Sequence, residues 1–288
     1  MDINRKNIKN FGIFLLPTVI LYCLVMIYPL LNTVYLSFFK WNGIGVKSFI
    51  GFSNFKEILL DPIFWKAIEN NLLWIVLSII NPMFIGLIIS VLLSNITKGQ
   101  KIYSAIFFIP VVLSLVTVSL VWGLMYNPII GPVNKILVVL GGKSVGWLGD
   151  PKTVSLAIII AGNWTYFGFC TVIFLAGLQS IEDSIIEAAI IDGAGGFRRF
   201  FSIIIPNLKN QVNLLVINSV IGSFKVFDII YNMTFGGPNH SSEVIATYMY
   251  WEAFKNGRVG YGSALSTVLT LVVGLFSIIY LKTMEEKA

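Results

Sequence analysis

The sequence predicts an all-α integral membrane protein with six transmembrane helices. Hydrophobic residues make up 56% of the chain and charged residues only 12%, whereas about a quarter of the residues in an ordinary soluble domain are charged. The apolar residues also gather into runs of about 20, the length that a helix needs to cross the hydrocarbon core of a bilayer. The net charge of +6 is spread over short segments between these runs and forms no basic stripe, so it does not indicate nucleic-acid binding.

Six segments are long and apolar enough to span a membrane, and five of them contain no Asp, Glu, Lys or Arg. Prolines inside these runs are expected to kink the helices rather than break them, because neighbouring helices and Ser or Thr groups can satisfy the freed carbonyls. We interpret Cys23 and Cys170, which also fall inside runs, as small buried apolar residues. The spans are predicted at residues 11–39, 72–94, 102–125, 154–178, 212–231 and 262–281, and their internal prolines are Pro17, Pro29, Pro82 and Pro110.

The loops between the spans give a weak indication of orientation, because Lys and Arg are divided almost equally between the two sets of loops. The basic residues crowded before the first span favour a cytoplasmic N-terminus, and an even number of spans then makes the C-terminus cytoplasmic as well. We therefore expect an N-terminal part with the first span and an outer loop, a five-helix core with a cytoplasmic loop at 179–211, and a cytoplasmic tail. These three parts cover residues 1–71, 72–281 and 282–288.

The cytoplasmic loop holds the most informative motif of the chain. Alanines let a short helix lie close against another protein surface, and Gly193 lets the backbone turn sharply, so two short helices joined at an angle are expected. Alternatively, or in addition, Ser184 and Glu187 form a capping box at a helix start. The motif reads Glu187-Ala188-Ala189, three residues, Gly193, nine residues, then Ile203-Ile204-Ile205-Pro206.

This motif resembles the EAA signature of the membrane subunits of ABC importers, and departs from it only at Ile205, where the family pattern has Leu. The resemblance implies the type I ABC-importer permease fold. It also implies that the first helix of the loop is the coupling helix, which docks on a cytoplasmic ATPase. The residues expected at this ATPase contact are Glu187, Ala188, Ala189, Asp192, Gly193 and Ala194.

Two outer-loop motifs, Phe49–Phe55 and Thr234–Pro238, resemble those of carbohydrate-type permeases, in particular the larger membrane subunit of maltose-type and glycerol-phosphate-type importers. The resemblance implies a permease in a bacterial cell membrane, in contact with membrane lipid. Its expected partners are a second homologous permease, two cytoplasmic ATPases, an extracytoplasmic solute-binding protein and a carbohydrate substrate. The chain has no phosphate-binding loop, so ATP and Mg are expected on the ATPases. We expect this chain itself to have no enzyme activity and to bind no cofactor or metal.

A sugar path needs polar groups for hydroxyls and aromatic faces for sugar rings. Alignment of the EAA loop with the maltose subunit places its sugar-contacting positions in spans four and five, where only Ser219 keeps a matching polar residue. Such Asn, Ser and Thr side chains also join helices in many membrane proteins, which is the alternative interpretation. The predicted path consists of Asn163, Thr165, Tyr166, Phe169, Ser219, Gly222, Ser223 and Val226.

Other functions stay open with less support. A permease for glycerol phosphate or another non-sugar solute shares the loop motifs. An ion-coupled secondary transporter normally shows a repeat and intramembrane carboxylates, and only Asp228 is available. We expect Asp228 to pair with Lys225 on one helix face. A membrane-bound enzyme needs a nucleophile, a base or a metal cluster, and the lone His240 offers none of these.

Overall fold

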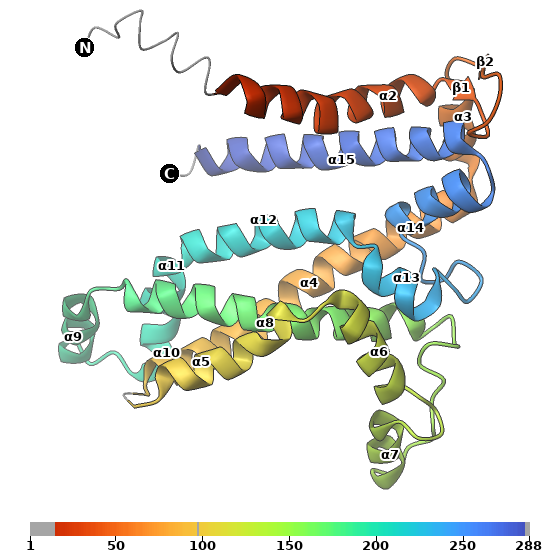
Figure 1. Cartoon of the computed structure of the whole chain (residues 1–288). Helices are drawn as coiled ribbons and strands as arrows, with labels where there is room; N and C mark the ends of the chain where they lie inside the picture. Colours follow the sequence, from red (N-terminus) through yellow and green to blue (C-terminus); the bar gives the residue numbers. More distant parts are fainter. Residues whose placement is uncertain (1–14, 97, 286–288) are drawn as a thin grey trace, which may run out of the picture. The chain divides into compact units, whose positions relative to one another are not determined.

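The computed structural model describes residues 15–96 and 98–285, and this part of the chain is almost entirely helical (Figure 1). The two short strands are β1 (Phe39–Lys40) and β2 (Ser48–Phe49), an antiparallel pair with Phe39 opposite Phe49. The described chain forms two compact units, one made of the residues up to Asp61 with Tyr248–Val272, and the other of Pro62–Thr247 with the residues from Val273 onward.

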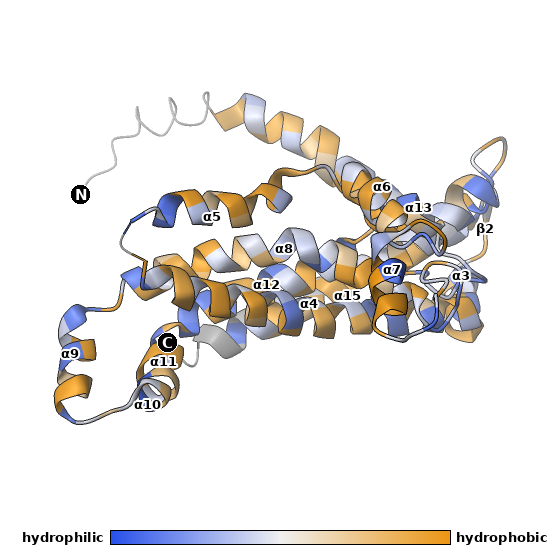
Figure 2. Cartoon of the chain, turned by 90° about the horizontal axis from the view of Figure 1, so that it is seen from below, coloured by the Kyte–Doolittle hydropathy of each residue, from blue (hydrophilic) through white to orange (hydrophobic). Residues whose placement is uncertain are grey.

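Four helices are each long and apolar enough to cross a membrane, and apolar residues predominate along much of their length (Figure 2). The first, Leu15–Leu36, contains a π-helical turn before α2 (Tyr28–Leu36). The others are α4 (Pro62–Ser94), α8 (Val154–Gln179) and the Val259–Tyr280 part of α15 (Val259–Glu285). The predicted membrane protein of long helices is thus confirmed, with four to six crossings according to how bent segments are counted.

One predicted span, 102–125, and the segment that leads into another, 212–231, are sharply bent. Helix α5 (Gln100–Phe108) continues into a 3₁₀ turn and then meets α6 (Leu115–Met125) at 94°. The expectation that Pro110 only kinks this span is therefore wrong. Proline has no N–H and its ring clashes with the preceding turn, and the helix tightens and stops here. The other bent segment, Gly196–Asn207, meets α12 (Lys209–Lys225) at 64°.

The predicted span 212–231 is divided as well. Helix α12 ends at Lys225, Val226 has an extended backbone, and α13 (Asp228–Thr234) begins a new helix. The expected ion pair between Lys225 and Asp228 is absent from the described residues, since the chain leaves the helix between them. Cys170 is buried as predicted, whereas Cys23 is exposed, so its interpretation as a buried residue is wrong.

Small residues allow the close packing of α4 on α8. A Cβ at Gly86 of α4 would lie 2.6 Å from the Cβ of Cys170, so the two helices meet there almost backbone to backbone. The same elements carry two buried clusters, one around Trp74 and Ile158 and the other around Cys170 and Phe174. This packing sets the distance between α4 and α8, two of the helices that line the candidate site described below.

The remaining elements are short and lie in the connections. Asn54 of the Phe49–Phe55 motif is buried and donates hydrogen bonds to the carbonyls of Ser37 (2.8 Å) and Phe39 (3.1 Å). A side-chain amide is needed at this position of the motif because it can donate both bonds. The connecting helices are α3 (Ser53–Leu60), α7 (Pro132–Val139), α9 (Asp183–Ile191), α10 (Gly196–Arg199), α11 (Ile205–Asn207) and α14 (Ile245–Tyr250), and π-helical turns cover Phe200–Ile204 and Trp251–Lys255.

Candidate functional site

The Glu187–Pro206 motif begins in the separate helix α9, which projects from one end of the second unit (Figure 1). The residue before it, Glu182, has the extended backbone of an N-cap, and Ser184 donates its hydroxyl to the Glu182 carboxylate at 3.3 Å. The proposed capping box of Ser184 with Glu187 is therefore wrong, because Ser184 lies inside the first turn of the helix. Glu187 stays exposed, with its carboxylate available to a partner.

Gly193 ends α9 in a left-handed conformation with φ of +75°. The amide of Gly193 donates to the Ile190 carbonyl at 3.0 Å and the amide of Ala194 to the Ala189 carbonyl at 2.9 Å. These two bonds form a Schellman motif, which satisfies carbonyls at a helix end and favours glycine at the left-handed position. Gly193 thereby produces the sharp turn that the sequence predicted, and the chain re-enters a helix at Gly196.

The surface of α9 combines acidic and apolar side chains. Ala189 is buried, whereas Ala188, Asp192 and Gly193 are exposed and Ala194 is half-buried. Ile190 is exposed as well, and Ile191 is 85% exposed. Exposed apolar side chains on a projecting helix are typical of a protein contact. The sequence prediction missed these two isoleucines, although an Ile-Ile pair directly after the Ala188-Ala189 pair of the motif was a usable signal.

The predicted substrate path lies along a hollow of about 300 Å³ between α4, α8 and α12. Of the eight predicted residues, seven line it, namely Asn163, Thr165, Tyr166, Ser219, Gly222, Ser223 and Val226. Phe169 does not. It stacks on Tyr166, with ring centroids 5.7 Å apart, and packs against the buried cluster around Cys170.

Several polar groups of this hollow join helices. Asn163 donates to the carbonyl of Leu77 at 3.0 Å and accepts the hydroxyl of Ser78 at 2.9 Å, which links α8 to α4. Ser219 donates to the carbonyl of Ser78 at 3.3 Å and so links α12 to the same point. Ser223 uses its hydroxyl within α12, on the Ser219 carbonyl. The alternative interpretation, in which these groups hold the bundle together, thus describes their present contacts.

Asn218 and Gly222 leave part of the hollow open. Asn218 is exposed and lies one helical turn before Gly222, whose missing Cβ would meet no atom within 4 Å. Trp74 of α4 adds an indole that packs on Gly162, where a Cβ would be 2.9 Å from the ring. The predicted path did not include Trp74, because no spacing in the sequence relates it to α8.

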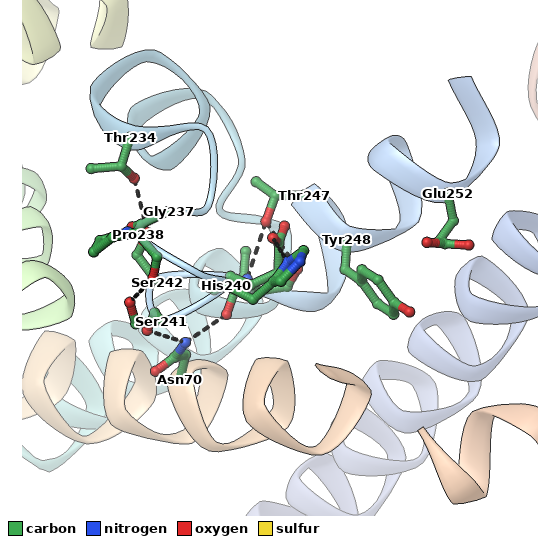
Figure 3. A network of polar contacts seen from close by, with 12 residues as sticks. Asn70, Thr234, Gly237, Pro238, His240, Ser241, Ser242, Thr247, Tyr248 and Glu252 are labelled. Atoms are coloured by element: carbon green, nitrogen blue, oxygen red, sulfur yellow. Dashed lines mark hydrogen bonds and ion pairs between the residues drawn. The ribbon is translucent and has the colours of Figure 1, made fainter. Parts of the chain in front are cut away.

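The loop that contains and follows the Thr234–Pro238 motif packs over α4 (Figure 3). Asn70 of α4 donates to the carbonyls of Ser241 (2.9 Å) and Glu243 (2.7 Å). The buried Glu243 carboxylate lies 2.9 Å from Nδ1 of His240, and a Cβ at Gly236 would be 2.4 Å from the same carboxylate. Only glycine therefore fits at Gly236, which also has φ of +84°. These contacts give the Thr234–Pro238 motif a structural role in closing the loop.

Comparison with known proteins agrees with this architecture. Residues 86–284 match the family model described as the binding-protein-dependent transport system inner membrane component. The chain is 35% identical to a probable ABC transporter permease, YurN, of Bacillus subtilis, over 99% of this chain and all of that protein. It is 33% identical to the lactose transport system permease protein LacF of Rhizobium radiobacter (99% and 98% covered), and 34% identical to the trehalose/maltose transport system permease protein MalF of Thermococcus litoralis (94% and 92% covered).

The fold also matches a chain of a bacterial ABC transporter involved in the import of alginate, with a TM-score of 0.84 over 98% of both chains at 22% identity. The matched family region contains the whole of α9, its Gly193 turn and the hollow-lining parts of α8 and α12. The chain belongs to the family of binding-protein-dependent transport system inner membrane components, the permease subunits of ABC importers.

Proposed function

We propose that this permease moves a sugar or oligosaccharide, delivered by an extracytoplasmic binding protein, across a bacterial cell membrane. Each bent helix pair counts as one crossing, which gives six spans with both termini in the cytoplasm. A second homologous permease completes the path, and two ATPases bind Mg-ATP and contact α9. The observation that carries the proposal is α9 itself, a projecting helix with a Schellman turn at Gly193 and an exposed surface of Glu187, Ala188 and Ile191.

The connections of α9 supply a mechanism for alternating access. Helix α8 ends three residues before α9, and the α10 to α11 segment leads from α9 into α12. Both α8 and α12 line the hollow, so a displacement of α9 by the ATPases reaches both walls of the path. Two discrete arrangements of these packed elements then expose the path to one side of the membrane at a time.

The chemistry of the hollow favours a neutral solute over glycerol phosphate. None of the described side chains that line it is charged, and they include Trp74, Tyr166 and Asn218. Aromatic faces and amides suit sugar rings and hydroxyls, whereas a phosphate calls for Arg or Lys. A volume of about 300 Å³ is at the lower end of ligand sites, about 300–1,000 Å³, which fits a half-site completed by the second permease.

The ATPase contact is tested with two matched variants. Ile191→Asp places a charge on α9, and Ile44→Asp changes an equally exposed isoleucine of the β1–β2 hairpin. We expect the ATPase to co-purify with wild type and Ile44→Asp but not with Ile191→Asp. Retention of the ATPase by both variants would remove α9 from the contact. Transport by a preparation without any ATPase would instead establish the secondary transporter.

The substrate class is tested by uptake of lactose, maltose, trehalose and glycerol 3-phosphate into cells that carry the complete importer. We expect at least one neutral sugar to be taken up in an ATP-dependent manner and glycerol 3-phosphate to be excluded. Uptake of glycerol 3-phosphate alone would contradict the sugar proposal and leave the permease assignment intact.

A further inference from the structure

We propose that the loop of residues 127–147, which contains α7, is a membrane-surface anchor that binds anionic lipid. This loop lies at the N-terminal end of α8, and α9 follows the C-terminal end of the same helix. Because α8 crosses the membrane, the anchor and α9 are on opposite membrane faces. The inference requires only that the chain is a membrane protein, and it does not depend on the transported solute.

The loop has a definite structure organised by one buried amide. Asn134 is buried, and its side chain donates to the carbonyls of Asn127 (3.3 Å) and Val145 (3.0 Å). Its oxygen accepts the Val145 amide at 2.9 Å and the Trp147 indole N–H at 3.2 Å. Ser144 closes the loop with a hydrogen bond to the Pro128 carbonyl at 2.7 Å. The side chains of this loop are therefore presented on a fixed scaffold.

The polarity of α7 is inverted relative to a helix that faces water. Asn134 points inward and Val133 packs against the cluster around Trp74, whereas Lys135 and most of the apolar residues are exposed, with Val139 85% exposed and Ile129, just before the helix, 84% exposed. Ile130, Ile136, Val138 and Leu140 are exposed too, and Figure 2 shows that apolar residues predominate along α7. A patch of this size on a rigid loop indicates contact with an apolar phase or with a partner.

The charges around this patch favour lipid as the occupant. A groove of about 460 Å³ runs through the patch, lined by Ile129, Val138 and Val139 together with Lys135 and Ser144. Residues 126–149 contain two lysines, Lys135 and Lys143, and no acidic residue. An apolar face bordered by lysines is the composition of a helix that lies in the headgroup region of an anionic membrane.

The position of the loop agrees with this occupant. Helix α6 makes an angle of 94° with the helix before it, so it runs along the membrane plane if α5 runs across it. Figure 1 shows α6 and α7 leaving the α4–α8 bundle sideways. Tyr126, just before the loop, is buried and packs on Trp147 at its end, with ring centroids 5.8 Å apart, so both ends of the loop are fixed on the helices beneath it.

A fluorescent label at position 139 tests the proposal. Val139→Cys is labelled with bimane in a Cys23→Ala background, in the purified importer in nanodiscs of phosphatidylcholine and phosphatidylglycerol. Val46→Cys is the matched control, since Val46 is 95% exposed and lies in the connection between the first long helix and α4. Each label is in a connection that leads to the N-terminal end of a spanning helix, α4 or α8, and these two ends are on one membrane face because Ser155 of α8 donates a hydrogen bond to Asn70 of α4.

We expect brominated lipid to quench the label at position 139 at least twofold more than the label at 46, and aqueous iodide to do the reverse. Quenching of position 139 by iodide alone would place the patch in water, and protection from both quenchers would show a protein partner on it. Either result overturns the proposal. In the double variant Lys135→Glu/Lys143→Glu, lipid quenching at 139 should fall in discs with phosphatidylglycerol and not in phosphatidylcholine discs. Unchanged quenching in both would refute the anionic-lipid component.

Discussion

Replacement of Gly193 by Ala isolates the contribution of one backbone conformation to the turn that ends α9. Gly193 has φ of +75°, and no atom lies within 4 Å of the position that a Cβ would take, so the alanine side chain has no clash. A left-handed conformation costs a non-glycine residue about 1–2 kcal/mol. The turn at the end of α9 is therefore expected to lose about 1 kcal/mol, which makes its local opening roughly fivefold more frequent.

Gly195 provides the matched control. A methyl group at this position would also lie in open space, but the φ of −62° and ψ of +165° of Gly195 are accessible to any residue. Gly195→Ala is expected to leave the turn unchanged or to stabilise it slightly, because alanine reduces the freedom of the unfolded chain. The difference between the two variants thus reports the left-handed backbone and not the added methyl group.

Hydrogen–deuterium exchange of the loop amides measures this difference in the assembled importer. The amides of Gly193 and Ala194 donate the two bonds of the turn, so the peptide that contains them should exchange roughly fivefold faster in Gly193→Ala, in line with about 1 kcal/mol of lost stability. Gly195→Ala should match wild type. Equal exchange in Gly193→Ala and wild type would refute the Schellman turn as the element that fixes α9.

Three further predictions concern polar contacts and one close approach. Asn163→Ala removes the links to Leu77 and Ser78 and should lower the stability of the complex by about 0.6–2 kcal/mol, measured by thermal unfolding; an unchanged melting temperature would contradict the helix-joining role. Asn218→Ala removes an exposed amide, so it should preserve that temperature and raise the KM for uptake, and an unaltered KM would exclude Asn218 from the path. Gly177→Ala puts a Cβ 2.6 Å from Leu208, which should destabilise by about 1–3 kcal/mol; Gly222→Ala, with no neighbour within 4 Å, is the control.

Hydropathy predicted where the chain is apolar, but it does not predict where an apolar helix changes direction. Pro82 and Pro110 occupy similar apolar runs, yet α4 continues through Pro82 while the chain breaks shortly after Pro110. Both prolines lack an N–H and both are buried, so neither residue type nor burial tells which of them comes before a break. The break between Lys225 and Asp228 was missed for a similar reason, because a run of suitable length does not indicate that one residue within it is extended.

The candidate site was predicted in its position more accurately than in its contacts. Residues of span four and span five line one hollow. The prediction placed them there because the motif between the two spans fixes the alignment of both with the family. Which polar groups face that hollow depends on a third helix, α4, whose Ser78 is 85 residues from Asn163 in the chain. A single sequence carries no signal for such a pair. For this reason the predicted path did not include Trp74, and it included Phe169, which does not line the hollow.

The segments before and after α9 meet at one packed point. In the proposed mechanism, a displacement of α9 is transmitted to the other helices there. Leu208 lies at the 64° bend between α11 and α12, is fully buried, and packs directly on Gly177 near the end of α8. In the proposed mechanism, a displacement of α9 acts on α8 and α12 together at this point, because Leu208 and Gly177 are in contact. Farther along, the hydrogen bonds of Asn163 and Ser219 to residues 77 and 78 tie both helices to α4. The end of the hollow farther from α9 is therefore bonded to α4. In the proposed mechanism, the path can open at the end near α9 while the end farther from α9 stays closed.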